Sequence, residues 1–137
     1  VLNGGSGDDT LCGGPGNDIL TGGSGADTFV WHLGDGGTAG TPAVDTITDF
    51  NVTEGDVIDI KDLLVGETTA TLTHYLHFEH SGTNTIIDIS STGAFNGSNY
   101  ATAVDQKIVL ANVDLLGATD TDVINNLLAT HSLRTDP

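Results

Sequence analysis

Aspartates recur every nine residues at the start of the chain, in a setting that suits cation binding. Residues 4–30 divide into three nonamers, GGSGDDTLC, GGPGNDILT and GGSGADTFV, with Asp9, Asp18 and Asp27 at the sixth position. Glycine occupies the first, second and fourth positions, so the first six residues can curl into a tight loop that turns backbone carbonyls inward. A carboxylate beside such carbonyls is an oxygen-only ligand set, which Ca²⁺ prefers. The repeats therefore predict several calcium sites.

The last three residues of each nonamer predict the element that positions these loops. Leu11, Leu20 and Phe29 hold the eighth position, which fits a short strand with its central side chain in a narrow core. One nonamer cannot bury its apolar side chain alone, so successive copies must stack, with loops on alternating sides and ions between neighbouring loops. Residues 1–3 match the end of one more copy, so we expect these repeats to be the end of a longer array.

Charge and composition exclude several classes of function. The 137 residues include 19 Asp and Glu but only 3 Lys and Arg, for a net charge of -16. Binding to nucleic acid or to an anionic membrane surface needs clustered cations, so we expect neither. No apolar run approaches the ~20 residues of a membrane span. Cys12 has no second cysteine for an intrachain disulfide, so bound cations are the obvious means of holding the acidic chain together.

The three nonamers resemble the RTX (repeat-in-toxin) calcium-binding nonapeptide, a β-roll repeat. This resemblance implies that the sixth-position aspartates Asp9, Asp18 and Asp27 ligate calcium through their side chains. It also implies ligation by backbone carbonyls at the first, third and fifth positions. These are the carbonyls of Gly4, Ser6, Asp8, Gly13, Pro15, Asn17, Gly22, Ser24 and Ala26.

The segment DTITDFNVTEGDVIDI, residues 45–60, resembles the block that follows the last repeat in many secreted RTX proteins. In those relatives some of the acidic residues complete a final calcium site. The resemblance makes Asp45 and Asp49 candidate ligands, with a solvated strand edge as the open alternative. For Asp56 and Asp59 we favour an ordinary structural position.

The rest of the chain predicts strands and one helix. The runs LTHYLHFE, TNTIIDIS and QKIVLANV within residues 72–113 predict antiparallel strands. Polar residues 120–122 precede apolar residues at helical spacing, which predicts a short helix. The predicted fold class is all-β: a calcium-bound parallel β-roll over residues 1–33 leads into a cap domain over residues 34–137. We expect this cap to be antiparallel and sandwich-like, with the short helix near the C-terminus.

The order of the blocks after the repeats resembles the C-terminal target domain of type I secretion substrates. In that family an uncleaved signal near the C-terminus is read by an ABC transporter, an adaptor protein and an outer-membrane channel. The resemblance places this signal in the last helix and strand. Its candidate residues are Val123, Ile124, Leu127, Leu128 and Leu133.

Catalysis and transition-metal binding find little support in the sequence. The motifs G-x-S-x-G, H-E-x-x-H and the P-loop do not occur, so we expect no enzyme activity. On a strand, His74 and His80 share one face while His77 points to the other, so we do not expect a common zinc site. Cys12 stands at the outward ninth position and is expected to be an exposed thiol without function.

These observations favour a calcium-dependent folding and type I secretion module of a large RTX protein, secreted by or displayed on a Gram-negative bacterium. An adhesin is the favoured parent, and the fragment is expected to be a monomer. One alternative is an extracellular module that binds a glycan or protein through an aromatic patch of Tyr75, Phe95 and Tyr100. Another is the non-catalytic C-terminal domain of a secreted RTX protease or lipase.

Overall fold

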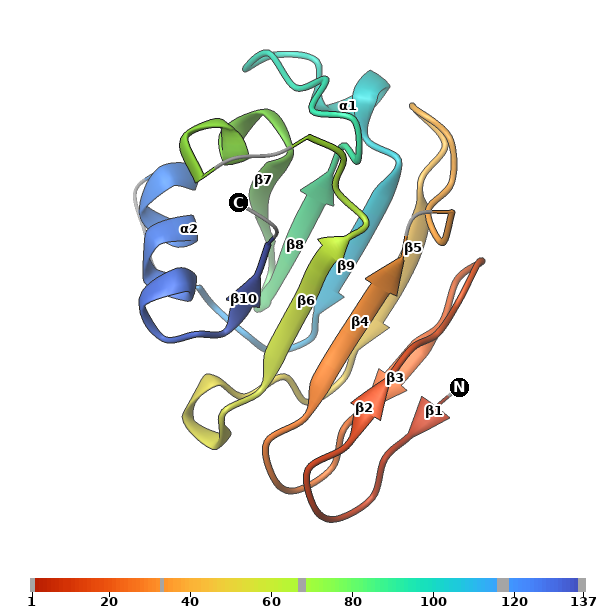
Figure 1. The fold of residues 1–137 in the computed structure, drawn as a ribbon, viewed down its shortest axis with the longest axis vertical. Helices are drawn as coiled ribbons and strands as arrows, with labels where there is room; N and C mark the ends of the chain where they lie inside the picture. The colour runs from red at the N-terminus through yellow and green to blue at the C-terminus, as the bar shows by residue number, and fades with distance from the viewer. Residues whose placement is uncertain (1, 33, 67–68, 116–118, 136–137) are drawn as a thin grey trace.

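The chain folds as two β-sheets that lie face to face, with its longest helix, α2 (Asp120–Ala129), beside them (Figure 1). The computed structural model describes residues 2–32, 34–66, 69–115 and 119–135. The six-stranded sheet contains, in spatial order, β1 (Leu2–Asn3), β3 (Ile19–Thr21), β5 (Ala43–Ile47), β9 (Gln106–Leu110), β8 (Asn84–Ile89) and β7 (Leu76–Ser81). The four-stranded sheet contains β10 (Leu133–Arg134), β6 (Val57–Asp62), β4 (Thr28–His32) and β2 (Thr10–Leu11). The helical elements are η1 (Val52–Glu54), η2 (Thr69–His74), α1 (Tyr100–Ala103) and α2 (Asp120–Ala129).

The first six strands alternate between the two sheets, which is the winding of a parallel β-roll. β1, β3, β5 and β9 pair in parallel in one sheet, and β2, β4, β6 and β10 pair in parallel in the other. The eighth-position side chains of the repeats are in register, since Leu2 lies opposite Leu20 and Leu11 lies opposite Phe29. The predicted parallel roll is therefore present.

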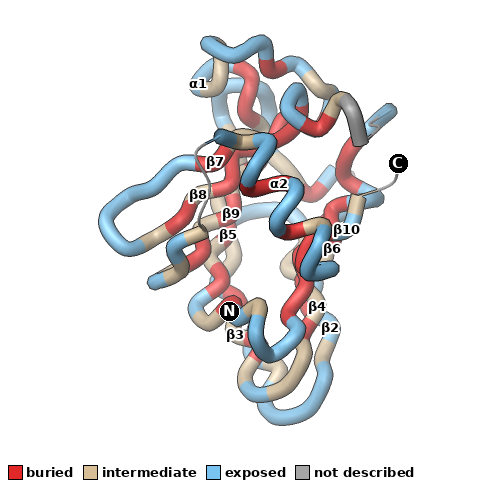
Figure 2. Tube along the Cα trace, turned by 90° about the vertical axis from the view of Figure 1, so that its left-hand side faces the viewer, coloured by how far each residue is buried: buried red, intermediate tan, exposed pale blue. Residues whose placement is uncertain are grey.

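This register continues beyond the repeats. In the six-stranded sheet Leu20 lies opposite Ile47, which lies opposite Leu110. The corresponding row in the other sheet is Leu11, Phe29, Ile58 and Leu133. The two rows of side chains are buried between the sheets, and Figure 2 shows burial concentrated along the strands while the loops stay exposed. The core of the roll thus extends almost to the end of the chain.

The predicted antiparallel sandwich-like cap is not a separate pair of sheets. Among the described strands only β7 with β8 and β8 with β9 pair antiparallel, and they extend the six-stranded sheet. The other strands after residue 34 join the sheets of the roll, because their central apolar residues continue its two rows. The predicted domain boundary falls at residue 33, outside the described residues, and both sheets and the main core combine strands from before and after it.

One predicted strand begins later than expected, and the predicted helix is present. The strand expected from residue 72 begins at Leu76, and η2 precedes it. Leu72 and Tyr75 are both buried three residues apart, a spacing that a 3₁₀ turn places on one side. The helix predicted near the C-terminus is α2, where the Thr119 side chain accepts a hydrogen bond from the Asp122 amide and caps the first turn.

The expected aromatic patch is wrong, because two of its three members are in the interior. Tyr75 and Phe95 are 6% and 2% exposed, and the Tyr75 hydroxyl donates to the Val65 carbonyl. Tyr100 is half-buried and stacks on the His77 ring. No helix within the described ranges is long and apolar enough to cross a membrane.

The difference in burial between two neighbouring residues of β3 predicts different effects of their substitution. Leu20 is 0% exposed and Ile19 is 47% exposed. In the calcium-saturated chain, Leu20→Ala should lower the free energy of unfolding by about 2–5 kcal/mol through lost burial and a cavity. Ile19→Ala should change it by about 0.5 kcal/mol or less. Urea unfolding followed by circular dichroism measures both, and equal losses would contradict this placement of the core.

Candidate calcium sites

The first and third repeat loops stack on the same side of the roll. Ser6 and Ser24 form a parallel bridge, and the Ser24 amide donates to the Gly5 carbonyl at 3.2 Å. At the end of the loops, the Thr28 amide donates to the Asp9 carbonyl at 2.8 Å. Residues 4–9 and 22–27 therefore form two adjacent turns of backbone at the edge of the sheets, at the lower end of the view in Figure 1.

Hydrogen bonds from the backbone amide of each repeat aspartate to the carboxylate of an aspartate in the following turn link these turns. Asp27 Oδ1 accepts the Asp9 amide at 2.9 Å, across one turn of the roll. On the other side of the roll, Asp45 Oδ1 accepts the Asp18 amide at 2.7 Å. Asp56 Oδ1 accepts the Asp27 amide at 2.8 Å. Each Oδ1 thus holds neighbouring turns together through a backbone amide.

The second oxygen of each repeat aspartate is left for another partner. Oδ2 of Asp9, Asp18 and Asp27 is buried and accepts no hydrogen bond from the described residues. A buried carboxylate oxygen without a donor is costly, so native structures satisfy it. Three equivalent oxygens in the same state, one per repeat, agree with the predicted calcium ligation by these aspartates, which stays a prediction.

The first glycine of each repeat makes room beside this oxygen. A Cβ at Gly4 would lie 2.7 Å from Asp9 Oδ2 and 2.8 Å from the Gly22 carbonyl oxygen. A Cβ at Gly13 would lie 2.5 Å from Asp18 Oδ2, and one at Gly22 would clash with Asp27 Oδ2. Any larger residue would therefore fill the space beside the carboxylate. At Gly4 the carboxylate and a carbonyl of the next turn converge, which is the oxygen-only set predicted for calcium.

The fifth-position side chains have a structural role that the sequence did not predict. Asp8 Oδ1 accepts the Ala26 amide at 2.8 Å, and Asn17 Oδ1 accepts the Val44 amide at 2.8 Å. Both side chains bind the following turn of the roll on their own side. The ligand role predicted for the carbonyls of these residues, and for those of Ser6, Pro15, Ser24 and Ala26, stays a prediction.

Asp45 occupies the sixth position of the next turn, but its carboxylate is already saturated. Oδ1 accepts the Asp18 amide, and Oδ2 accepts Trp31 Nε1 at 2.7 Å and Gln106 Nε2 at 3.1 Å. Three protein donors thus reach the two oxygens of Asp45, and its role as a calcium ligand stays a prediction. Asp49 also accepts protein donors at both oxygens, from the amides of Gly22 and Gly23 at 2.9 and 2.8 Å.

Asp56 follows Asp9 and Asp27 on the side of the first and third loops, a role that the sequence did not predict. Its Oδ1 accepts the Asp27 amide and its Oδ2 accepts the Asn51 amide at 2.8 Å. The spacing could have predicted this role of Asp56, because Asp56 lies two residues before the core residue Ile58. The same aspartate-to-core spacing occurs at Asp45 and Ile47 and in every repeat.

Burial makes ionisation of these aspartates costly. It raises the pKa of Asp27, and the nearby charges of Asp9, Asp49 and Asp8 add to this effect against an opposing backbone hydrogen bond. Burial is also the largest cause of the raised pKa of Asp45 and of Asp56. A cation beside Asp27 would reverse the balance, since it favours the ionised form.

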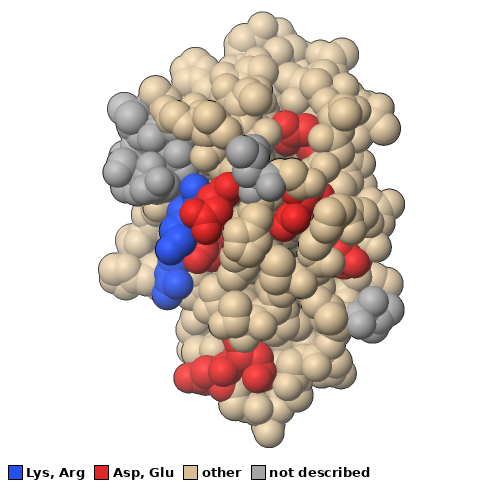
Figure 3. All heavy atoms as spheres, turned by 45° about the vertical axis from the view of Figure 1, so that its right-hand side comes forward, with Lys and Arg blue, Asp and Glu red and all other residues tan. Residues whose placement is uncertain are grey.

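Within the described residues, no salt bridge joins a Lys or Arg to Asp9, Asp18 or Asp27. Lys107 pairs with Asp88 at 3.3 Å and Arg134 pairs with Asp59 at 3.8 Å. Figure 3 shows Lys and Arg atoms in one strip of the visible face and acidic atoms in several separate places on it. Small cations remain the physical means of neutralising the repeat carboxylates.

The histidines considered for zinc have separate partners. His74 ends η2 and its Nδ1 lies 3.0 Å from the Phe95 carbonyl oxygen. His77 Nδ1 lies 2.7 Å from Asp120 Oδ2, and His80 Nε2 lies 3.1 Å from Asp114 Oδ1. The structure does not bring the three rings together.

Residues 1–29 match the family model of the RTX calcium-binding nonapeptide repeat, with four copies. The repeats therefore bind Ca²⁺, in agreement with the converging oxygens at the loops. Among curated proteins no match was found.

The solved structures that resemble the chain include two from the mannuronan C5-epimerase of Azotobacter vinelandii. The solution structure of its AlgE6R3 subunit has 29% sequence identity and a TM-score of 0.52, and the match covers 80% of this chain and 58% of that one. The AlgE6R2 subunit has 23% identity and a TM-score of 0.60, with 98% and 86% covered, and supports the fold alone. This chain thus combines RTX calcium-binding repeats with a mostly β fold that resembles these R-modules.

The orphaned oxygen of Asp27 predicts the effect of removing its charge. Asp27→Asn should weaken calcium binding roughly tenfold or more, about 1.4 kcal/mol, because one ligand oxygen becomes neutral. Isothermal titration calorimetry measures the loss. Asp114→Asn, which changes a carboxylate that is 70% exposed outside the loops, is the matched control. Equal affinities for Asp27→Asn and the control would contradict the site.

The raised pKa values of Asp27, Asp45 and Asp56 predict how pH acts on the calcium-free chain. The folded state binds these protons more tightly than the unfolded state, so its stability should rise as pH falls from neutral through the raised pKa values. In saturating calcium, acid should instead lower stability because protons compete with the ion. Thermal melts with and without calcium measure both trends, and a calcium-free chain destabilised by mild acid would contradict the burial argument.

Proposed function

We propose that the chain is a calcium-dependent folding and type I secretion module of a larger extracellular protein. The observation that carries the proposal is the row of buried Oδ2 atoms of Asp9, Asp18 and Asp27 without donors. These oxygens make the folded roll dependent on a cation. The module would therefore stay unfolded inside the cell, where calcium is scarce, and fold outside.

The energy available for this switch follows from mass action. A ligand that binds only the folded state stabilises it by about 2.7 kcal/mol per site at 100 times its Kd. Extracellular calcium modules bind with Kd values of roughly 10⁻⁴–10⁻³ M. A typical domain has a free energy of unfolding of about 5–15 kcal/mol. The stabilisation from several filled calcium sites would be a large fraction of that value. Folding would then follow the calcium concentration steeply.

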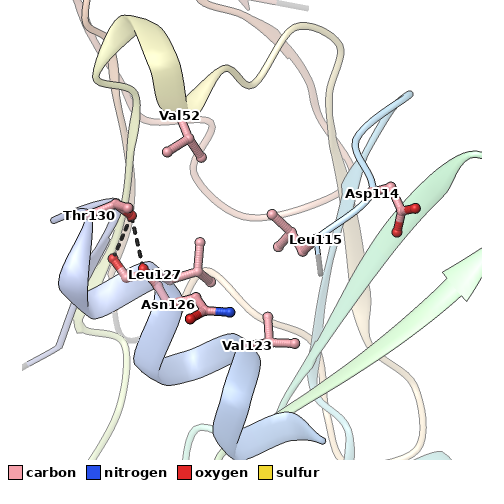
Figure 4. A pocket seen from close by; sticks show the side chains of 7 residues that line it. All are labelled: Val52, Asp114, Leu115, Val123, Asn126, Leu127 and Thr130. Carbon is pink, nitrogen blue, oxygen red and sulfur yellow. Dashed lines mark hydrogen bonds between the residues drawn. The ribbon is translucent and has the colours of Figure 1, made fainter. Parts of the chain in front are cut away.

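The candidate secretion signal supports an order of events. Val123, Ile124, Leu127 and Leu133 are 3–4% exposed, and Leu128 is half-buried. Val123 and Leu127 face an apolar hollow of about 200 Å³ beside Val52 and Leu115 (Figure 4). A transporter could contact these side chains only before the chain folds. Recognition by an ABC transporter, an adaptor and an outer-membrane channel would therefore precede calcium binding.

The proposal is tested by exporting a passenger fused to the N-terminus of the full chain. Secretion should require a type I exporter and should fall at least tenfold in Val123→Asp/Leu127→Asp. Asn125→Asp adds a charge on the exposed face of the same helix and should leave export unchanged. Quantitative immunoblotting of medium and cells, with and without the exporter, measures the effect.

Two results would overturn the secretion role. One is a passenger that reaches the medium without the exporter, and the other is a double variant exported as well as Asn125→Asp. A Gram-negative parent of the adhesin class remains the favoured context. A non-catalytic C-terminal domain of a secreted protease or lipase is equally compatible with the calcium sites.

A second candidate function is an accessory module of a polysaccharide-modifying enzyme. The AlgE6R3 subunit, 29% identical over 80% of this chain, comes from a mannuronan C5-epimerase. In this case the calcium-loaded chain should bind mannuronan oligosaccharides in calorimetry. Binding without exporter-dependent secretion would favour the accessory module, and secretion without binding would favour the targeting module.

A further inference from the structure

Three chemically different metal donors meet at the ends of two neighbouring strands of the four-stranded sheet. Cys12 directly follows β2, His32 ends β4, and Asp35 lies in the turn that follows β4. The parallel pairing of Leu11 with Phe29 brings β2 beside β4. These residues are separate from the repeat aspartates.

The turn after β4 fixes Asp35 against His32. The Asp35 amide donates to the His32 carbonyl at 3.0 Å, and the His32 amide donates to Asp35 Oδ2 at 2.9 Å. This reciprocal pair of hydrogen bonds holds the carboxylate next to the imidazole. The Asp35 side chain is 12% exposed while His32 is 51% exposed, so the cluster is anchored on one side and open on the other.

The distances within the cluster match the edges of a tetrahedral metal site. Cys12 Sγ lies 3.5 Å from His32 Nδ1, which lies 3.8 Å from Asp35 Oδ2. One ligand atom from each of the three residues lies within 4.8 Å of the others. Zinc bonds of about 2.3 Å to sulfur and about 2.0–2.2 Å to nitrogen or oxygen place tetrahedral ligands roughly 3.3–3.6 Å apart. Small side-chain rotations would close the remaining difference.

The second ring nitrogen of His32 also has a carboxylate nearby. His32 Nε2 lies 4.0 Å from Asp62 Oδ2 on β6. A histidine that binds metal through one nitrogen commonly donates its other N–H to such a carboxylate, which fixes the ring. Within the described residues, no Lys or Arg forms an ion pair with Asp35 or Asp62.

We propose that Cys12, His32 and Asp35 bind a divalent transition-metal cation of the zinc type, with a fourth position open to solvent. Sulfur and imidazole donors disfavour Ca²⁺, which takes oxygen ligands, so the site is chemically distinct from the repeat loops. Coordination releases the Cys12 thiol proton to solvent and leaves a metal-bound thiolate. The metal joins consecutive turns of the roll on the side of the second loop.

A second cluster of potential ligands serves as the internal control. Ligand atoms of His77, Glu79 and Asp88 also lie within 4.8 Å of one another. There Lys107 Nζ lies 3.3 Å from Asp88 Oδ1 and already supplies a positive charge. Burial and the hydrogen bond to Glu79 raise the pKa of Asp88 to about 7, so this cluster also retains a proton near neutral pH.

The test is a Co²⁺ titration of the calcium-saturated full chain, followed by displacement with Zn²⁺. Cys12 is the only cysteine, so a thiolate-to-cobalt charge-transfer band reports on this site even if Co²⁺ also enters oxygen sites. The band should saturate at one cobalt per chain, disappear in Cys12→Ser and persist in His77→Ala. His32→Ala and Asp35→Asn should weaken cobalt binding at least tenfold, with unchanged circular dichroism.

Three outcomes would overturn the proposal. The first is the lack of a charge-transfer band in the unmodified chain. The second is a cobalt affinity that His32→Ala and Asp35→Asn leave unchanged. The third is a stoichiometry of one cobalt per two chains. The last would mean that Cys12 binds metal only between molecules. Because calcium is saturating throughout, the result does not depend on calcium-driven folding. It also does not depend on the secretion role, since no exporter takes part in the titration.

Discussion

The structure depends on three buried carboxylate oxygens that the protein itself does not satisfy. Asp9, Asp18 and Asp27 each use Oδ1 or the backbone amide to join adjacent turns, and each keeps Oδ2 without a donor. The short strands between the loops contribute only two or three residues each, so they cannot offset this cost through a large apolar core. Under the proposed function, folding of the repeats and cation binding are one process.

At the end of the roll, the buried aspartate oxygens have protein hydrogen-bond donors. At Asp45 the indole of Trp31 and the amide of Gln106 donate to Oδ2, and at Asp56 the backbone amide of Asn51 does so. The parallel strands β5, β6, β9 and β10 meanwhile continue both apolar rows, so cation-dependent turns pass directly into turns held by protein donors. The C-terminal part can thus support the repeats without being a separate sandwich.

The sequence predicts the strictly periodic part well. Nine-residue spacing located the loops, the parallel strands, the eighth-position core residues and the aspartates, because each repeat places the same residue types in the same local conformation. The prediction from spacing missed the role of Asp56. There the two-residue spacing from aspartate to the core residue Ile58 persists, but the glycines of the repeat are absent. The prediction also failed to pair Cys12 with His32, since that contact depends on the register of β2 against β4.

The most direct test of the central claim is a calcium titration of the full chain followed by circular dichroism and amide NMR, with magnesium as the control ion. The account predicts a cooperative gain of β signal, and dispersed amide resonances for residues 4–9 and 22–27, with calcium but not with magnesium. A chain whose spectra are folded and unchanged in chelator would contradict it, because the buried carboxylates would then need no cation.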